Sequence, residues 1–184
     1  MSGIATRKFT YEDLRAMPLD GKRYELLEGE IYMAPSPNVK HQNVLLNLAS
    51  ALRAFVRERG LGAVFVAPLD VVLSDQNVVQ PDIFFVRRDG FQAITPLFVN
   101  GAPDLAVEIL SPSNADFDRT TKRRAYNAAG VPEVWYVDPR DDSIEVLRLG
   151  PDGAYALVSR LSGTDVLRSP SFPGFELPLS AIFS

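Results

Sequence analysis

The sequence predicts an α/β protein of the α+β type, in which a mixed, strand-rich sheet lies between two helices. Short apolar segments of strand length recur along the chain, whereas helical periodicity extends over only two longer segments, about 38–59 and 115–129. A chain of 184 residues with 46% hydrophobic residues can form one real core. We therefore expect a single domain over residues 1–184.

Three helices are expected. Thr10 and Asp13 have the spacing of a capping box and predict a short helix that starts at Tyr11. The segment 38–59 is predicted to be the longest helix, because its apolar residues recur on one face. These residues are Val44, Leu45, Leu48, Leu52, Phe55 and Val56. The third helix, near 115–129, is predicted to end at Gly130.

The predicted strands lie at 22–27, 30–34, 63–67, 69–73, 78–86, 104–110, 133–137, 143–149, 154–160 and 165–168. The first two should form an N-terminal hairpin around Glu28-Gly29, and 143–149 should pair with 154–160 nearer the C-terminus. Pro81 cannot donate to a ladder and marks an edge or a bulge in the strand 78–86. Residues 88–102 are expected to be a loop, and a Pro-rich tail ends the chain.

Composition excludes several classes of protein. No segment reaches the roughly 18 apolar residues of a membrane span, and the N-terminus lacks the pattern of a secretion signal, so we expect a cytoplasmic protein. With no cysteine and one histidine, a metal would have to be held by oxygen. The formal net charge of −4 argues against broad attraction to nucleic acid, although the basic residues are bunched.

Two acids interrupt apolar strands. Glu108 lies inside the run 104–110, and Asp82 precedes the apolar residues 83–86. An unpaired carboxylate is costly to bury, and two carboxylates on neighbouring strands repel each other unless a cation joins them. The pair therefore suggests a site for a divalent ion. Asp82 after Pro81 is equally typical of a strand end.

The predicted helix after residue 114 places Asp118, Lys122 and Tyr126 on one face, at i, i+4 and i+8. Lys122 can then point back at the sheet, where an ammonium group can orient a water molecule or stabilise charge on a phosphate. The alternative is a structural ion pair between Lys122 and Glu108. Tyr126 is more often a core residue with a hydrogen-bonded hydroxyl.

Pro81-Asp82 followed by Glu108-Ile109-Leu110 resembles the PD-(D/E)XK signature of restriction-endonuclease-like nucleases. The strings QPDIFF, EILSPS, DRTTKRRAYNAAGVPEVWYVDP and FPGFEL resemble the Uma-two family of that superfamily. The likeness covers about 20–180. Leu110 occupies the position of the superfamily's lysine, and in this family the lysine appears on the following helix, where it matches Lys122.

The resemblance implies a restriction-endonuclease-like fold and a site in which Asp82, Glu108 and the main-chain carbonyl of Ile109 hold Mg²⁺ or Mn²⁺. An activated water would then attack a phosphodiester, with Lys122 beside it. It also suggests that Glu28 projects from the first hairpin towards the metal, although a solvated turn residue fits equally.

Further residues have a functional and an ordinary interpretation. His41 either contacts the scissile phosphate or lies on the helix surface. Asp118 either orients Lys122 or forms a minor surface pair with it. Arg119 and Arg123 either contact backbone phosphates or form a solvated helix face.

The leading hypothesis is a metal-dependent DNA endonuclease that acts on duplex or branched DNA. The rival hypothesis is an inactive nucleic-acid- or protein-binding module with the same fold, which the acidic pI of about 5.0 favours slightly. A homodimer is expected, because cutting two strands favours two sites. No membrane partner is expected.

Overall fold

Helices and strands alternate irregularly along the computed structural model, which describes residues 7–18 and 20–184. Residues 1–6 and Leu19 lie outside the described part. The predictions of a domain over residues 1–184 and of an N-terminus without a secretion signal both include residues 1–6. The helices are α1 (Tyr11–Arg15), α2 (Val39–Glu58), the 3₁₀ helix η1 (Arg88–Ala93), α3 (Ala115–Phe117), the π-helix η2 (Asp118–Lys122), α4 (Arg123–Ala129) and α5 (Leu179–Phe183).

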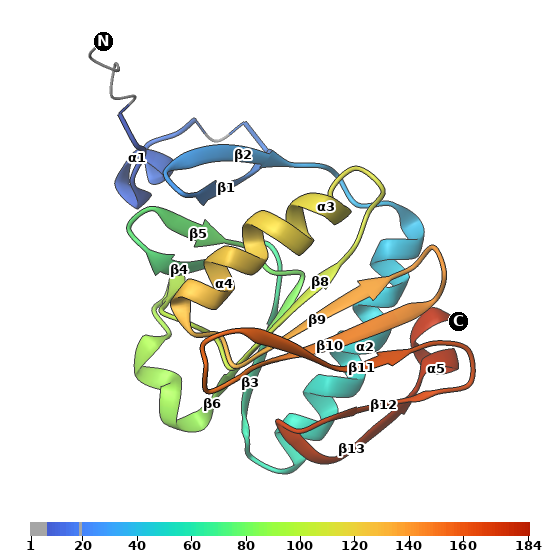
Figure 1. Ribbon diagram of the computed structural model, residues 1–184. Coiled ribbons are helices and arrows are strands. Elements are labelled where there is room, and N and C mark those ends of the chain that lie inside the picture. Colours follow the sequence, from blue (N-terminus) through green and yellow to red (C-terminus); the bar gives the residue numbers. More distant parts are fainter. Residues whose placement is uncertain (1–6, 19) are drawn as a thin grey trace.

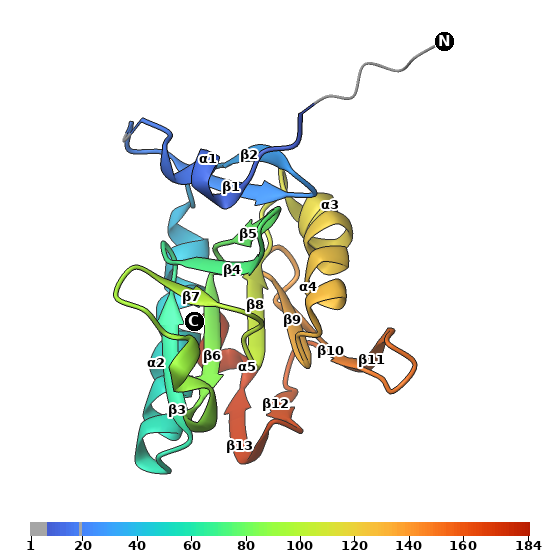
Figure 2. The same ribbon diagram turned by 90° about the vertical axis from the view of Figure 1, so that its left-hand side faces the viewer.

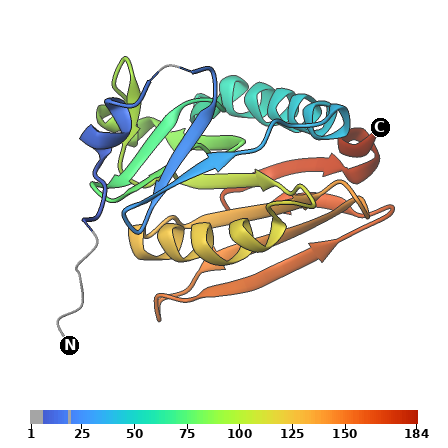
Figure 3. The same cartoon turned by 90° about the horizontal axis from the view of Figure 1, so that it is seen from above.

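A six-stranded mixed sheet forms the centre, in the order β11-β10-β9-β8-β6-β3. Its strands are β3 (Gly62–Val66), β6 (Ile83–Arg87), β8 (Leu105–Ile109), β9 (Glu133–Asp138), β10 (Ser143–Leu149) and β11 (Tyr155–Leu161). Helix α2 covers one face and the α3–η2–α4 segment covers the other (Figure 3). The predicted arrangement of a sheet between two helices is confirmed.

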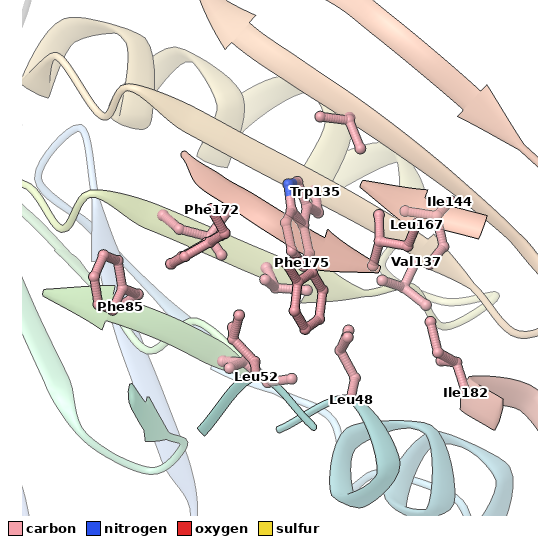
Figure 4. Packing of buried hydrophobic residues seen from close by; sticks show 14 of the residues in the cluster. Leu48, Leu52, Phe85, Trp135, Val137, Ile144, Leu167, Phe172, Phe175 and Ile182 are labelled. Carbon is pink, nitrogen blue, oxygen red and sulfur yellow. The ribbon is translucent and has the colours of Figure 1, made fainter. Parts of the chain in front are cut away.

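The two faces of this sheet form separate cores because successive side chains of a strand point to opposite sides. On the α2 side, Phe85 and Trp135 pack with Leu48 and Leu52 and with residues of the C-terminal segment (Figure 4). On the other side, Tyr126 of α4 packs against residues from the same strands. This double burial explains why β6, β8 and β9 read as continuous apolar runs.

A second sheet, in the order β2-β1-β5-β4-β7, lies across one end of the first (Figure 2). Its strands are β1 (Arg23–Leu27), β2 (Glu30–Ala34), β4 (Asp70–Ser74), β5 (Asn77–Val79) and β7 (Phe98–Asn100). The predicted N-terminal hairpin is confirmed, and Glu28 and Gly29 at its tip both have positive φ. A small third sheet pairs β12 (Val166–Ser169) with β13 (Phe172–Pro178) near the C-terminus (Figure 1).

Three predictions of local structure were wrong. Residues 78–86 form two strands in different sheets rather than one, since Pro81 cannot donate to a ladder and the chain turns at Gln80-Pro81-Asp82. The expected loop 88–102 contains η1 and β7. The expected tail forms β13 and α5, whose Phe175 and Ile182 complete the core against α2.

The helix predicted at 115–129 is present but contains a π-helical turn. The amide of Arg123 donates to the carbonyl oxygen of Asp118, five residues earlier, instead of the usual four. The hydroxyl of Tyr136 donates to the same carbonyl oxygen at 3.1 Å. The turn lies where Asp118 and Lys122 face the sheet.

None of the helices in the described part of the chain combines the length and hydropathy required to cross a membrane.

Candidate active site

Asp82 and Glu108 lie at the same end of two neighbouring strands. Strands β6 and β8 are antiparallel, and their register pairs Ile83 with Val107. The next residues outward are Asp82, just before β6, and Glu108, near the end of β8. Both side chains are buried, as the sequence suggested. The Pro81 turn therefore delivers Asp82 to the position beside Glu108.

Lys122 reaches this point from the η2 turn and contacts three carboxylates. Its Nζ lies 3.1 Å from Glu108 Oε2, 3.1 Å from Glu25 Oε1 and 3.4 Å from Asp118 Oδ1. Glu25 also accepts a 2.7 Å hydrogen bond from the amide of Gln80. All four charged side chains are at most 5% exposed. A single ammonium group thus joins acids from β1, β8 and η2.

Burial and charge shift the proton affinities of these groups. Burial raises the pKa of Glu108 well above its usual range, and Lys122 opposes the shift only in part. Burial likewise raises the pKa of Asp118 to about 6. Burial alone would lower the pKa of Lys122, but Glu108, Glu25 and Asp118 raise it well above the ordinary value. The lysine is therefore charged, whereas Glu108 and Asp118 lose their protons less readily than exposed carboxyl groups do.

His41 and Ile109 fix the orientation of Asp82. Asp82 Oδ2 accepts a 2.8 Å hydrogen bond from the amide of Ile109 and lies 3.2 Å from Nε2 of His41. His41 is in the first turn of α2, where Asn38 caps the helix. The histidine predicted to lie either at the site or on the surface is thus buried and joined to Asp82.

A narrow cavity of about 40 Å³ opens beside these groups. That volume holds a small ion or a few water molecules. It is lined by Arg23, Ala34, Pro35, Ser36, Pro37, His41, Asp82, Glu108, Ile109, Ser111, Asn114, Asp118 and Lys122. Two buried atoms at the cavity, His41 Nδ1 and Asp118 Oδ1, have no hydrogen-bond partner among residues 7–18 and 20–184, although the latter lies within ion-pair distance of Lys122. A buried polar atom of this kind can be satisfied by a bound ion or an ordered water.

The donor set fits a hard divalent cation held partly by the backbone. Within the described residues, no three Asp, Glu or His side chains converge closely enough to hold a metal ion by themselves. Asp82, Glu108 and a main-chain carbonyl such as that of Ile109 would supply oxygen ligands, and water would complete the shell, as Mg²⁺ prefers. Several buried carboxyl groups surround one ammonium group, so a bound cation would stabilise their ionised forms.

Tyr126 and Asp118 belong to the cluster, whereas Glu28 does not. The hydroxyl of Tyr126 donates a short hydrogen bond to Glu108 Oε1. Of the two interpretations of Glu28, the structure bears out the solvated turn residue: Glu28 is exposed at the hairpin tip and pairs with Arg124 at 3.0 Å. A residue in a two-residue turn lies beyond the paired strands, so its side chain cannot return to the sheet.

Arg119 and Arg123 point away from the cavity. Arg119 pairs with Glu145 and lies over the ring of Tyr136. Arg123 donates to the carbonyl oxygen of Tyr155 at 3.3 Å. Both flank a surface hollow on the outer side of α4, together with Thr120 and Arg124. Their contacts with phosphate remain a prediction.

Glu25 was missed by sequence reasoning, although a signal was available. It lies between Tyr24 and Leu26 in an apolar strand, the same pattern that singled out Glu108. Three acids occur within RYELLEGE, and the prediction named Glu28, which precedes the glycine, instead of Glu25. The buried acid of the hairpin is therefore the one in the strand.

A match to a protein-family model shows the family to which this chain belongs. The model of the Uma2 family, described as "Putative restriction endonuclease", matches residues 11–180. The chain belongs to this family. The strings that resemble Uma-two sequences, from QPDIFF to FPGFEL, all lie within the matched region, and no curated protein matches the chain.

A solved structure shows the same fold as this Uma2 chain. It is the crystal structure of a protein from Anabaena variabilis, described as "a putative nuclease". The sequences are 22% identical, the TM-score is 0.78, and the match covers 95% of this chain and 97% of the other. The predicted restriction-endonuclease-like fold is thereby confirmed.

Proposed function

We propose that this Uma2 protein is a DNA endonuclease that depends on Mg²⁺ or Mn²⁺ and hydrolyses phosphodiester bonds at the Asp82–Glu108–Lys122 cluster. The observation that carries the proposal is the convergence of these three side chains on one small cavity with an excess of carboxyl groups. Asp82 comes from the turn just before β6, Glu108 from β8 and Lys122 from η2. Membership of the family described as "Putative restriction endonuclease" supports it.

In this mechanism Asp82, Glu108 and the carbonyl of Ile109 would hold the metal. A bound Mg²⁺ would supply Lewis-acid chemistry, lowering the pKa of a coordinated water and polarising the phosphoryl oxygen. Lys122, kept cationic by three acids, orients the attacking water or offsets charge that develops on the phosphate. His41 holds Asp82 in position. No covalent intermediate is needed.

The chain as a whole would act as a single domain and as a homodimer that places two sites on two strands. Size-exclusion chromatography with light scattering measures the dimer directly. A monomer at assay concentration would remove this part of the proposal without affecting the site.

A second candidate function is a binding module that keeps the fold without activity. The favouring observation is that the ammonium of Lys122 is already engaged by three carboxylates, as in a structural ion-pair cluster. Such a protein would bind nucleic acid or protein in the presence of a chelator and cut no DNA in any divalent metal.

The deciding experiment incubates the purified protein with supercoiled plasmid and with branched DNA, in Mg²⁺, in Mn²⁺ and in chelator. The variants are Glu108→Gln and Lys122→Ala, with Lys22→Ala as a control that removes an exposed lysine. Metal-dependent cutting by the wild type and the control, lost in both site variants, supports the proposal. Equal cutting by wild type and Glu108→Gln would overturn it.

A further inference from the structure

Three arginines from two segments line a cavity at the end of α2 farthest from Asp82. Arg53 and Arg57 lie one turn apart near the C-terminus of α2, and Arg88 begins η1. The cavity measures about 450 Å³, and its wall is completed by residues 62–65 of β3 and by Phe91. Among the described residues that line it, none has an acidic side chain. The site is separate from the Lys122 cluster.

These guanidinium groups differ from neighbouring arginines in lacking an acidic partner. Arg59 pairs with Glu58, and Arg87 pairs with Asp104 at 2.8 Å. Across residues 7–18 and 20–184, no carboxylate lies within salt-bridge distance of Arg53, Arg57 or Arg88. Such a group of positive charges stands out in a protein of net charge −4. The planar, forked guanidinium binds phosphate oxygens in pairs.

Helix α2 connects this cavity to the candidate active site. It runs from its first turn, where His41 contacts Asp82 at one end of the central sheet, to the turn before β3 (Figure 1). No acid occurs along α2 before Glu58. At 1.5 Å per residue, the rise from His41 to Arg57 is about 24 Å, which corresponds to about seven base pairs of duplex at 3.4 Å each.

We propose that the Arg53–Arg57–Arg88 cavity binds a backbone phosphate of a nucleic-acid strand that extends along α2 from the active site. The nature of the ligand rests on the proposed function, because only a nuclease site at the other end of α2 makes a polynucleotide the expected occupant. The cavity itself recognises phosphate without reading bases, so it positions the strand and adds affinity that falls with salt.

The test measures binding separately from cleavage. Fluorescence anisotropy with a labelled duplex of about 16 base pairs, long enough to span both positions, is recorded in chelator on the Glu108→Gln background. Arg53→Ala/Arg57→Ala is compared with the parent protein. Arg148→Ala is the control, because it removes an exposed arginine from β10, on the far side of the sheet from β3.

The double variant should bind the duplex at least about 10-fold more weakly, and the slope of log affinity against log salt should fall by about 1, because one phosphate contact is lost. Arg88→Ala should lower the slope by about 1. Arg148→Ala should leave both quantities unchanged. Equal binding by the double variant and the Arg148→Ala protein would overturn the inference.

Two further measurements, of pyrophosphate binding and of DNA cutting, identify the source of the phosphate and separate this inference from the proposed function. If the arginine variants lose affinity for pyrophosphate but not for the duplex, the cavity holds a free phosphate ester and the strand proposal fails. If they lose affinity for the duplex while the wild type cuts no DNA, the inference stands and the nuclease function fails. If the wild type cuts DNA and the arginine variants bind and cut the duplex equally well, the nuclease function stands and the inference fails.

Discussion

The ammonium group of Lys122 lies 3.1 Å from the carboxylate of Glu25, a residue of the N-terminal hairpin in a different sheet from Glu108. Glu25 in turn accepts a hydrogen bond from the amide of Gln80, two residues before Asp82. The hairpin therefore joins the lysine to the segment that carries Asp82, the proposed metal ligand. Both sheets contribute to one site.

Glu25→Gln should lower the rate of DNA cutting about 10-fold or more, because Glu25 helps to hold Lys122 and to raise its pKa. The optimum pH for cutting should move downward, since Lys122 then loses its proton more easily. Glu30→Gln, which removes an exposed acid from the same hairpin, is the control. A pH profile identical to that of the wild type would show that Glu25 has only a structural role.

Lys122→Met should lower the free energy of unfolding by about 3–5 kcal/mol, because it leaves buried carboxylates without their cation. Adding Glu108→Gln to that variant should recover part of the loss without restoring activity. Urea denaturation and plasmid nicking measure the two effects. Recovery of nicking together with stability would identify the ion pair as structural.

The stability of the protein without metal should depend on Asp118 between about pH 4 and pH 6. Burial raises the pKa of Asp118 to about 6 in the folded protein, above its usual value of 3.8. The folded state binds this proton more tightly, so the contribution is complete below pH 4 and is lost as the pH rises to about 6. Asp118→Asn should flatten this part of the curve. Thermal melting in chelator at several pH values measures the difference in melting temperature between the wild type and Asp118→Asn. The pH dependence of this difference should vanish if Asp118 titrates normally.

Mg²⁺ should raise the melting temperature by about 5–10 °C at a concentration near 100 times its dissociation constant, because a cation that binds only the folded state stabilises it. Asp82→Asn should abolish the rise, and Asp75→Asn, at an exposed turn, should keep it. An equal rise in Asp82→Asn would place the ion elsewhere.

Glu133 provides a test of stability away from the site. Its carboxylate is fully buried and accepts hydrogen bonds from the indole of Trp135 and the hydroxyls of Ser169 and Ser171. Glu133→Ala should cost about 3 kcal/mol, since these donors lose their acceptor. Cutting per folded molecule should be unchanged. The fluorescence of the single tryptophan follows unfolding directly.

The long helix, the hairpins and the positions of the central strands along the chain follow from local patterns, and the sequence predicted them closely. The convergence of Asp82, Glu108 and Lys122 was also predictable, because acids in apolar strands are conspicuous and the lysine follows helical spacing. Glu25 was not found, since its partner Lys122 is distant in the sequence and only tertiary packing joins them. The division of residues 78–86 between two sheets likewise depends on what each half packs against.

The π-helical turn at 118–122 contains one residue more than an α-helix would need to follow the same path. Removing one residue there would restore a regular α-helical turn over the same path, so α4 and Tyr126 would keep their positions and only the side chains of the turn would be displaced from the sheet. A single-residue deletion would thus isolate the contribution of the turn that presents Asp118 and Lys122, because the strands, α2 and α4 would stay as they are.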